Sequence, residues 1–76
     1  QIYPNPSSGE LQIRVLQSIQ PNAMVELRDI QGRFIQAWEL PLNGLFSQQI
    51  HGLNPGMYFI AIRNGQQSYV EKWRIE

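Results

Sequence analysis

Short runs of alternating apolar and polar residues occur along almost the whole chain, and Gly, Pro or Asn residues lie between them. In the segment 10–16, for example, Leu11, Ile13 and Val15 alternate with polar residues. Successive side chains of a β-strand point to opposite faces, so this pattern predicts a strand that is buried on one face. No stretch keeps apolar residues at the i, i+3, i+4 spacing of an amphipathic helix over three turns. The sequence therefore predicts an all-β protein.

The alternating runs and the turn residues between them predict about seven short strands. Asp29 and Gly32 suit the first and last positions of a type I turn, and Asn64-Gly65 is a strong signal for a tight hairpin. Short strands at this spacing, with no helices between them, favour an antiparallel β-sandwich of the immunoglobulin or fibronectin type. The expected strands are Ile2–Tyr3, Glu10–Leu16, Met24–Arg28, Arg33–Glu39, Leu45–Ile50, Met57–Arg63 and Ser68–Ile75.

The apolar phase of each strand gives the expected core of the sandwich. In the segment 33–39 we expect Ile35 and Ala37 to point inward, which places Phe34 and Trp38 on the outer face. Phe59 alternates with its apolar neighbours and is likewise expected on an outer face. The complete predicted core consists of Leu11, Ile13, Val15, Val25, Leu27, Ile35, Tyr58, Ile60 and Ile62.

Two interpretations of the aromatic residues remain open. Trp38, Phe59 and Trp73 on an outer face would make a docking patch or a platform on which a sugar ring stacks. In the alternative interpretation these rings fill the core through a different register or shield the sheet backbone, since isolated exposed apolar residues are normal on protein surfaces.

Composition and charge limit the partners of the chain. The 76 residues include no cysteine and one histidine, His51, and carry zero net charge. A chain of this length builds one small core, so we expect a single domain over residues 1–76. Without cysteine or a histidine cluster we expect no metal site and no cofactor. Scattered arginines and the lack of an apolar run of ~20 residues argue against a nucleic-acid partner and against direct membrane insertion.

A nucleophilic catalytic site would need a base, and His51 is the only histidine, with Ser47 and Asp29 as conceivable partners. No motif places these three residues together. Most carboxylates occupy polar strand positions, where exposure to solvent explains them. Asp29 lies in a turn, where we expect its side chain to accept hydrogen bonds from main-chain amides two residues further on. We therefore expect no catalytic residues and no enzymatic activity.

Four short motifs occur in the same order as in a known protein family. They are Tyr3-Pro4-Asn5-Pro6 followed by Gly9, Asp29-x-x-Gly32-Arg33, Leu53-x-x-Gly56-x-Tyr58, and a basic terminal strand at Lys72. With these motifs the chain resembles, over its whole length, the type A C-terminal sorting domain of the type IX (Por) secretion system of Bacteroidetes.

The resemblance implies an immunoglobulin-like sandwich at the C-terminus of a large exported cargo protein, which is covalently linked to the N-terminal side of the domain. Domains of this family pass from the periplasm across the outer membrane to the cell surface or the extracellular space, and components of the type IX translocon bind them. A cell-surface sortase then removes the domain, or the domain serves for anchoring to lipopolysaccharide. The competing interpretation is an accessory carbohydrate-binding or adhesion module that uses Trp38 and Trp73 as stacking platforms.

Several motif residues have a structural explanation of their own. Pro4 and Pro6 each fix φ and make a stiff, extended segment. Gly32 and Gly56 suit turn positions with positive φ, where other side chains are strained. Tyr58 fits a tyrosine corner, in which the hydroxyl binds nearby backbone. The sequence leaves open whether these residues only build the fold or also contact the secretion machinery.

The terminal strand is the expected contact region of the domain. Lys72 and Arg74 are its candidate contact residues, and the edge of this strand is expected to offer unpaired backbone groups to which a partner adds a strand. The terminal segment differs from the family in ending with the acidic Glu76, where a basic or neutral residue is usual.

Overall fold

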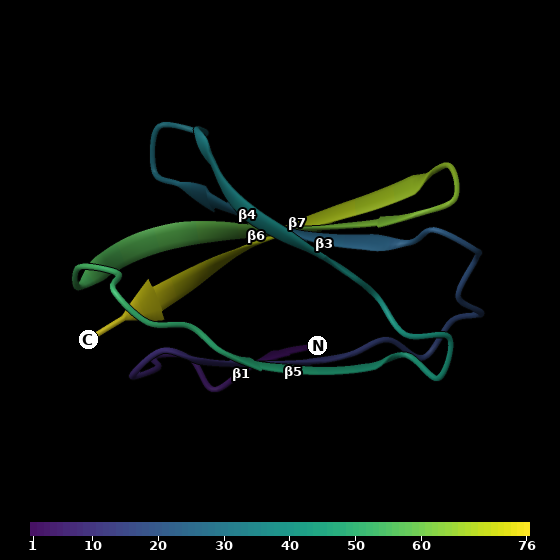
Figure 1. Ribbon diagram of the computed structural model, residues 1–76, viewed down its shortest axis with the longest axis horizontal. Coiled ribbons are helices and arrows are strands. Elements are labelled where there is room, and N and C mark those ends of the chain that lie inside the picture. The colour runs from purple at the N-terminus through teal and green to yellow at the C-terminus, as the bar shows by residue number, and fades with distance from the viewer.

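The computed structural model describes all residues of the chain, 1–76, and is built of strands and turns without a helix. The strands form two antiparallel sheets that face each other, which confirms the predicted all-β sandwich (Figure 1). Their bounds are β1 (Ile2–Tyr3), β2 (Glu10–Arg14), β3 (Met24–Asp29), β4 (Phe34–Glu39), β5 (Leu45–Gln49), β6 (Gly56–Asn64) and β7 (Gln67–Ile75).

The order of the strands determines which of them are sheet edges. In the three-stranded sheet β2 lies between β1 and β5, and in the four-stranded sheet the order is β4, β3, β6 and β7. The pairs β3–β4 and β6–β7 are hairpins, whereas the chain crosses between the sheets after β2, after β4 and after β5. Strands β1, β5, β4 and β7 are therefore the edges, and their outer backbone groups need another partner or solvent.

The hydrophobic core lies between the two sheets and consists of one cluster of 12 buried residues. The members that the alternation predicted correctly are Leu11, Ile13, Val25, Leu27, Ile60 and Ile62. The other members are Ala23, Leu40, Phe46, Ile50, Trp73 and Ile75. Of the remaining predicted core residues, Val15 and Tyr58 are only partly buried at the border of the cluster, and Ile35 is exposed.

The prediction for β4 was wrong because this strand contains a β-bulge. The register between β3 and β4 shifts between Leu27 and Arg28, so that Phe34 pairs with Arg28 while Trp38 pairs with Val25. Positions 34 and 38 would share a face in a regular strand, but the extra residue puts them on opposite faces. Trp38 therefore points inward, against Phe46 at a ring-centroid distance of 5.6 Å. Ile35 stays 37% exposed, and Phe34 points outward as expected.

The connection between β2 and β3 is held by a buried asparagine. This connection begins earlier than predicted, because β2 ends at Arg14 rather than at Leu16. The Asn64 side chain accepts a hydrogen bond from the Gln20 N–H (2.7 Å) and donates one to the Ser18 carbonyl (2.9 Å). Asn64 itself is the last residue of β6 and pairs with Gln67, so the hairpin loop is one residue later than the predicted Asn-Gly turn. This asparagine thus joins the hairpin to a segment that is distant in sequence.

Gly9 stands where the chain enters β2, and only glycine fits there. Its φ is +114°, and a Cβ atom added to it would lie 2.6 Å from the Ile50 carbonyl oxygen. The close approach is needed because the Ile50 N–H donates to the Gly9 carbonyl at 2.8 Å. The glycine therefore lets the start of β2 and the end of β5 meet without a side chain between them.

The core assignment predicts the effect of truncating Ile60. We expect Ile60→Ala to lower the free energy of unfolding by about 2 to 5 kcal/mol, because the fully buried side chain leaves a cavity. Val70→Ala is the matched control, since Val70 is 63% exposed on the neighbouring strand, and its effect should stay within about 0.5 kcal/mol. Urea titration measures both values. A loss below about 0.5 kcal/mol for Ile60→Ala would show that the inner face of β6 is wrongly assigned.

Candidate recognition surface

The two ends of the chain meet at the C-terminal half of β7. Ser7 forms an isolated parallel bridge with Ile75. The Ser7 N–H donates to the Arg74 carbonyl (2.8 Å), and the Glu76 N–H donates to the Ser7 carbonyl (2.9 Å). These bonds extend the four-stranded sheet by a short parallel segment along the edge of β7.

The Pro-Asn-Pro motif adds side-chain contacts to this bridge. The Asn5 side chain donates to the Lys72 carbonyl and accepts from the Arg74 N–H, both at 3.1 Å. The Trp73 indole N–H donates to the Pro4 carbonyl at 3.1 Å. Both prolines of the motif follow cis peptide bonds. We call residues 4–7 the clamp, because their hydrogen bonds hold the terminal strand along the length 72–76.

Ser7 is the clamp residue that the sequence analysis missed. It is buried, its hydroxyl donates to the Glu10 carbonyl (2.6 Å), and the same hydroxyl accepts from the Gly9 N–H (3.1 Å). These bonds fix the turn that leads from the clamp into β2. In the sequence Ser7 is one of a cluster of turn residues that directly follows Pro-Asn-Pro. Its main-chain partners are at the other end of the chain, so no local pattern identifies its role.

The clamp corrects the expectation that the whole edge of the last strand is open. Main-chain groups of Lys72 and Arg74 point away from β6 and already bind the clamp. Alternate residues of a strand direct their backbone groups to the same side, so Ser68 and Val70 also point outward. Their N–H and C=O groups make no hydrogen bond in the structure. Only the first half of β7 is therefore available for strand addition.

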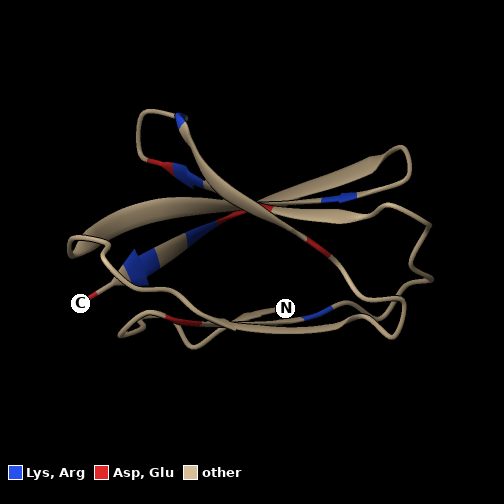
Figure 2. Ribbon diagram, viewed as in Figure 1, with Lys and Arg blue, Asp and Glu red and all other residues tan.

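Lys72 and Arg74 carry their side chains on the outer face of the four-stranded sheet. Lys72 pairs with Phe59, and Arg74 pairs with Met57 on β6. Phe59 in turn pairs with Arg28 on β3. Figure 2 shows the basic residues of β7 at the same end of the molecule as the β3–β4 hairpin. We call this surface the basic face and define it by Arg28, Phe34, Met57, Phe59, Lys72 and Arg74.

The charges of the basic face differ in whether they have a partner. Arg28 forms a salt bridge with Glu26 at 3.1 Å, and its guanidinium lies 5.6 Å from the centroid of the Phe34 ring. Lys72 and Arg74 are exposed and form no salt bridge. Two positive charges that form no salt bridge in the fold are therefore available to an external partner.

The proposed aromatic docking patch is not assembled in the structure. Trp73 is fully buried, and Trp38 points inward against Phe46, because both belong to the inner phase of their strands. Phe59 lies on the outer face as expected, with Phe34 as its aromatic companion there. Trp73 thus belongs to the core and Trp38 packs against it, so the two rings do not form a sugar-stacking platform on an outer face.

A comparison with known protein families matches the amino-acid sequence of the chain to one of them. The family model of the secretion system C-terminal sorting domain matches residues 1–76, which is the whole chain. The chain belongs to this family. It is a C-terminal sorting signal for type IX secretion. The family is one of sorting signals and not of enzymes. No curated protein matches the chain, and no helix of the structure is long and apolar enough to cross a membrane.

Asp29 organises the β3–β4 hairpin of the sorting domain, as the turn pattern predicted. Its carboxylate accepts hydrogen bonds from the main-chain N–H groups of Gln31 and Arg33, both at 2.9 Å, and from the Arg33 side chain at 2.8 Å. The Gly32 N–H donates to the Asp29 carbonyl, which closes the turn, and Gly32 has a φ of +85°. The main-chain bond from Arg33 lowers the pKa of Asp29 most, and the Arg33 side chain and the Gln31 amide act in the same direction.

The motif Leu53-x-x-Gly56-x-Tyr58 of the sorting domain forms the predicted tyrosine corner. The Tyr58 hydroxyl donates to the Asn54 carbonyl at 2.7 Å, four residues upstream. Gly56 begins β6 with a φ of +151°. The bond fixes the loop that leads from the three-stranded sheet into β6. Gly56 and Tyr58 thus build the corner at which the longest hairpin of the domain starts.

The residues considered for catalysis have other surroundings. His51 is exposed in the loop after β5, and Ser47 is exposed on β5. The carboxylate of Asp29, which a triad would need to orient the histidine, is bound to Gln31 and Arg33 instead. Asp29 therefore has a structural role in its hairpin.

The clamp predicts a loss of stability when Asn5 is truncated. We expect Asn5→Ala to lower the free energy of unfolding by about 1 to 2 kcal/mol, because two hydrogen bonds to the main chain of β7 are lost. Hydrogen exchange at the Arg74 amide should become faster in the same variant. Asn54→Ala is the control, because the Asn54 side chain makes no hydrogen bond and is exposed. Equal effects of the two substitutions would contradict the role of the clamp.

The hydrogen bonds of Asp29 predict a pH-dependent contribution to stability. Because its pKa is lowered in the folded state, the carboxylate contributes fully above its ordinary pKa of 3.8, and the contribution is lost as the pH falls through the lowered value. We therefore expect the stability difference between the natural protein and Asp29→Asn to be largest near neutral pH and to shrink in acid. Urea titrations over this pH range measure it. A difference that stays constant into acid would contradict the prediction.

Proposed function

We propose that the type IX machinery recognises this sorting domain through the basic face, with Lys72 and Arg74 as its contact residues. Partners that export many unrelated cargo proteins must bind the signal domain itself, since the cargo offers no common surface. The observation that carries the proposal is that Lys72 and Arg74 lie exposed, without a salt bridge, on a strand that the clamp holds in place. The matching partner surface is acidic.

The clamp supports the proposal because it orders the contact residues before binding. A free C-terminal segment would lose conformational entropy when it binds, and this loss weakens association. Here the backbone of Lys72 and Arg74 is bound to β6 on one side and to Asn5 and Ser7 on the other. Pro4, Asn5 and Pro6 therefore act as positioning residues for the signal.

The other family-motif residues have their role in the fold. Gly9 lets β2 approach β5, Asp29 and Gly32 build the β3–β4 hairpin, and Gly56 and Tyr58 build the corner before β6. In this proposal they influence secretion by keeping the sandwich intact. Substitutions at these positions should change secretion in proportion to their effect on stability.

The proposed route takes residues 1–76, as one domain at the C-terminus of a cargo protein, through the periplasm and across the outer membrane. There the components of a surface sortase cleave the domain off, or the domain is used for attachment to the cell surface. The domain has no catalytic activity of its own in this proposal. A carbohydrate-binding or adhesion module is not favoured, because Trp38 and Trp73, the rings that it would use, point into the core.

Charge reversal tests the proposal in a fusion protein. Residues 1–76 are attached to the C-terminus of a fluorescent protein that carries an export signal, in a host with the type IX machinery. We expect the natural fusion to reach the cell surface or the medium, and the Lys72→Glu/Arg74→Glu variant to remain in the periplasm with its cargo folded. Fractionation and fluorescence measure the distribution. A natural fusion that stays periplasmic would overturn the sorting function of the isolated domain.

The matched control is Arg14→Glu, compared with Arg74→Glu alone. Arg14 is exposed on β2 in the other sheet and forms no salt bridge. Arg14→Glu therefore changes the net charge by the same amount as Arg74→Glu, but on a different surface of the domain. Equal export of both single variants would show that the basic face is not the contact surface. Deletion of residues 72–76 is a poorer test, because it removes Trp73 and Ile75 from the core and unfolds the domain.

A further inference from the structure

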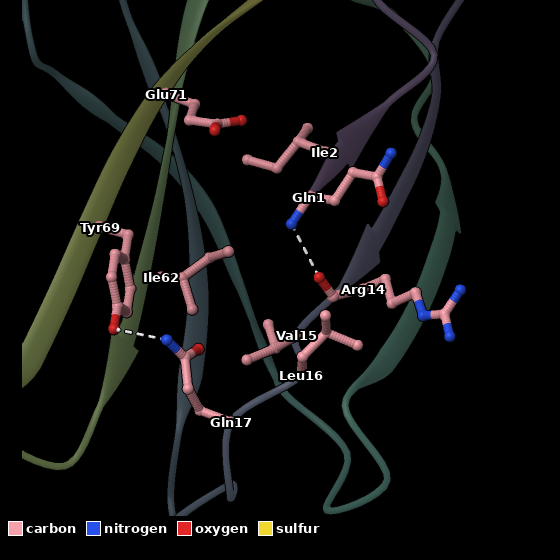
Figure 3. A pocket seen from close by; sticks show the side chains of 9 residues that line it. All are labelled: Gln1, Ile2, Arg14, Val15, Leu16, Gln17, Ile62, Tyr69 and Glu71. Atoms are coloured by element: carbon pink, nitrogen blue, oxygen red, sulfur yellow. Dashed lines mark hydrogen bonds between the residues drawn. The ribbon is translucent and has the colours of Figure 1, made fainter.

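One side of the sandwich is open. A cavity of about 410 Å³ lies between the sheets beside β1, and its walls include Ile2, Val15, Leu16, Ile62, Tyr69 and Glu71 (Figure 3). Tyr69 and Glu71 belong to the same phase of β7 as the buried Trp73 and Ile75, yet both are exposed. The cause is the shortness of β1, which consists of two residues. The three-stranded sheet therefore ends before it covers the first half of β7.

The pairing of β1 with β2 continues up to the first residue of the chain. The Gln1 nitrogen donates to the Arg14 carbonyl at 2.7 Å, and the Arg14 N–H donates to the Gln1 carbonyl at 2.8 Å. In antiparallel pairing such doubly bonded pairs alternate with non-bonded ones. The next bonded position on β2's side is Leu16, whose main-chain N–H and C=O make no hydrogen bond in the structure. If the same register continues upstream, the second residue before Gln1 is the pairing partner of Leu16.

We propose that the segment of polypeptide that joins the cargo to Gln1 fills this cavity as an upstream continuation of β1. The inference rests on the proposed cargo linkage, which the family's C-terminal position in exported proteins supports. Pro4 lies beside Trp73 of β7, and Gln1 and Ile2 line the cavity together with Glu71 and Tyr69. Traced from Pro4 back to Gln1, the chain therefore runs toward the first half of β7. Its continuation lies over the uncovered inner face of β7 and pairs with the free backbone of Leu16.

The register also determines which linker residue enters the cavity. Ile2 pairs with the buried Ile13 and shares its inward face. The residue directly before Gln1 has the same phase as Ile2 and lies opposite Val15, so it faces the cavity. An apolar side chain fits there, against Val15 and Ile62. The second residue before Gln1 points to the outside, which gives a matched control position.

Hydrogen exchange in the purified full-length protein tests the proposal without any secretion step, so its failure is distinct from a failure of the sorting function. We expect the Leu16 amide to be protected, and an Asp substituted directly before Gln1 to speed its exchange by about tenfold or more, because this charge would be buried in the cavity. The same substitution one residue further upstream should leave the exchange unchanged. Amides of β6 and β7 that stay protected verify the fold in each variant. An unprotected Leu16 amide, or equal effects of the two substitutions, would overturn the proposal.

Cross-linking gives a second measurement on the same protein. A cysteine directly before Gln1 is combined with Tyr69→Cys, which faces the cavity, or with Val70→Cys, which faces the outer side of the sheet. Residues 1–76 contain no other cysteine. A short bis-maleimide reagent should join the first pair in most molecules and the second pair in few. Similar yields for both pairs would contradict a linker that lies in the cavity.

Discussion

The hydrogen bonds between the clamp and the end of β7 are the constraint on which the rest of this small sandwich depends. They join residues up to 69 positions apart, so the first and last segments of the chain become ordered together. Without them, the backbone of Lys72 and Arg74 would form an exposed edge, and the Trp73 indole N–H would lose its partner inside the core. Closing so long a loop costs conformational entropy, and the buried Trp73 and Ile75 offset this cost by removing apolar surface from water.

Local patterns predicted the parts of the structure that local interactions determine. The alternation in β2, β3 and β6 identified the inner faces correctly, and the hairpin at Asp29 and the corner at Tyr58 depend on hydrogen bonds that span only a few residues. Two of the family motifs were visible in the sequence for the same reason. The motif at Asp29 and Gly32 is a turn and the motif at Gly56 and Tyr58 is a corner, and their residue types follow from backbone geometry.

The errors came from interactions that no local pattern contains. The bulge in β4 depends on its pairing with β3, and it reversed the expected positions of Trp38 and Ile35. Trp73 was considered for an outer face together with Trp38 and Phe59, but it is fully buried, and its indole N–H donates to the Pro4 carbonyl near the other end of the chain. Likewise, the edge of β7 is half closed because Ser7 reaches it from the opposite end of the chain. The sequence identified Lys72 and Arg74 as candidate contact residues. Only the fold shows that neither of them forms a salt bridge.

Net charge is a poor guide to the surface of this domain, because folding sorts the charges into pairs. The sequence has six basic and six acidic residues and appears neutral. In the sandwich, Arg28, Arg33 and Arg63 bind Glu26 or Asp29, so much of the basic charge is compensated locally. Lys72 and Arg74 share the outer face of one strand and have no such partner, which leaves a local positive surface on a neutral molecule. This surface exists only while Trp73 and Ile75 are buried on the other face of the strand, since their burial fixes the alternation that turns both basic side chains outward. Stability of the core and presentation of the basic face are therefore two consequences of the same strand placement.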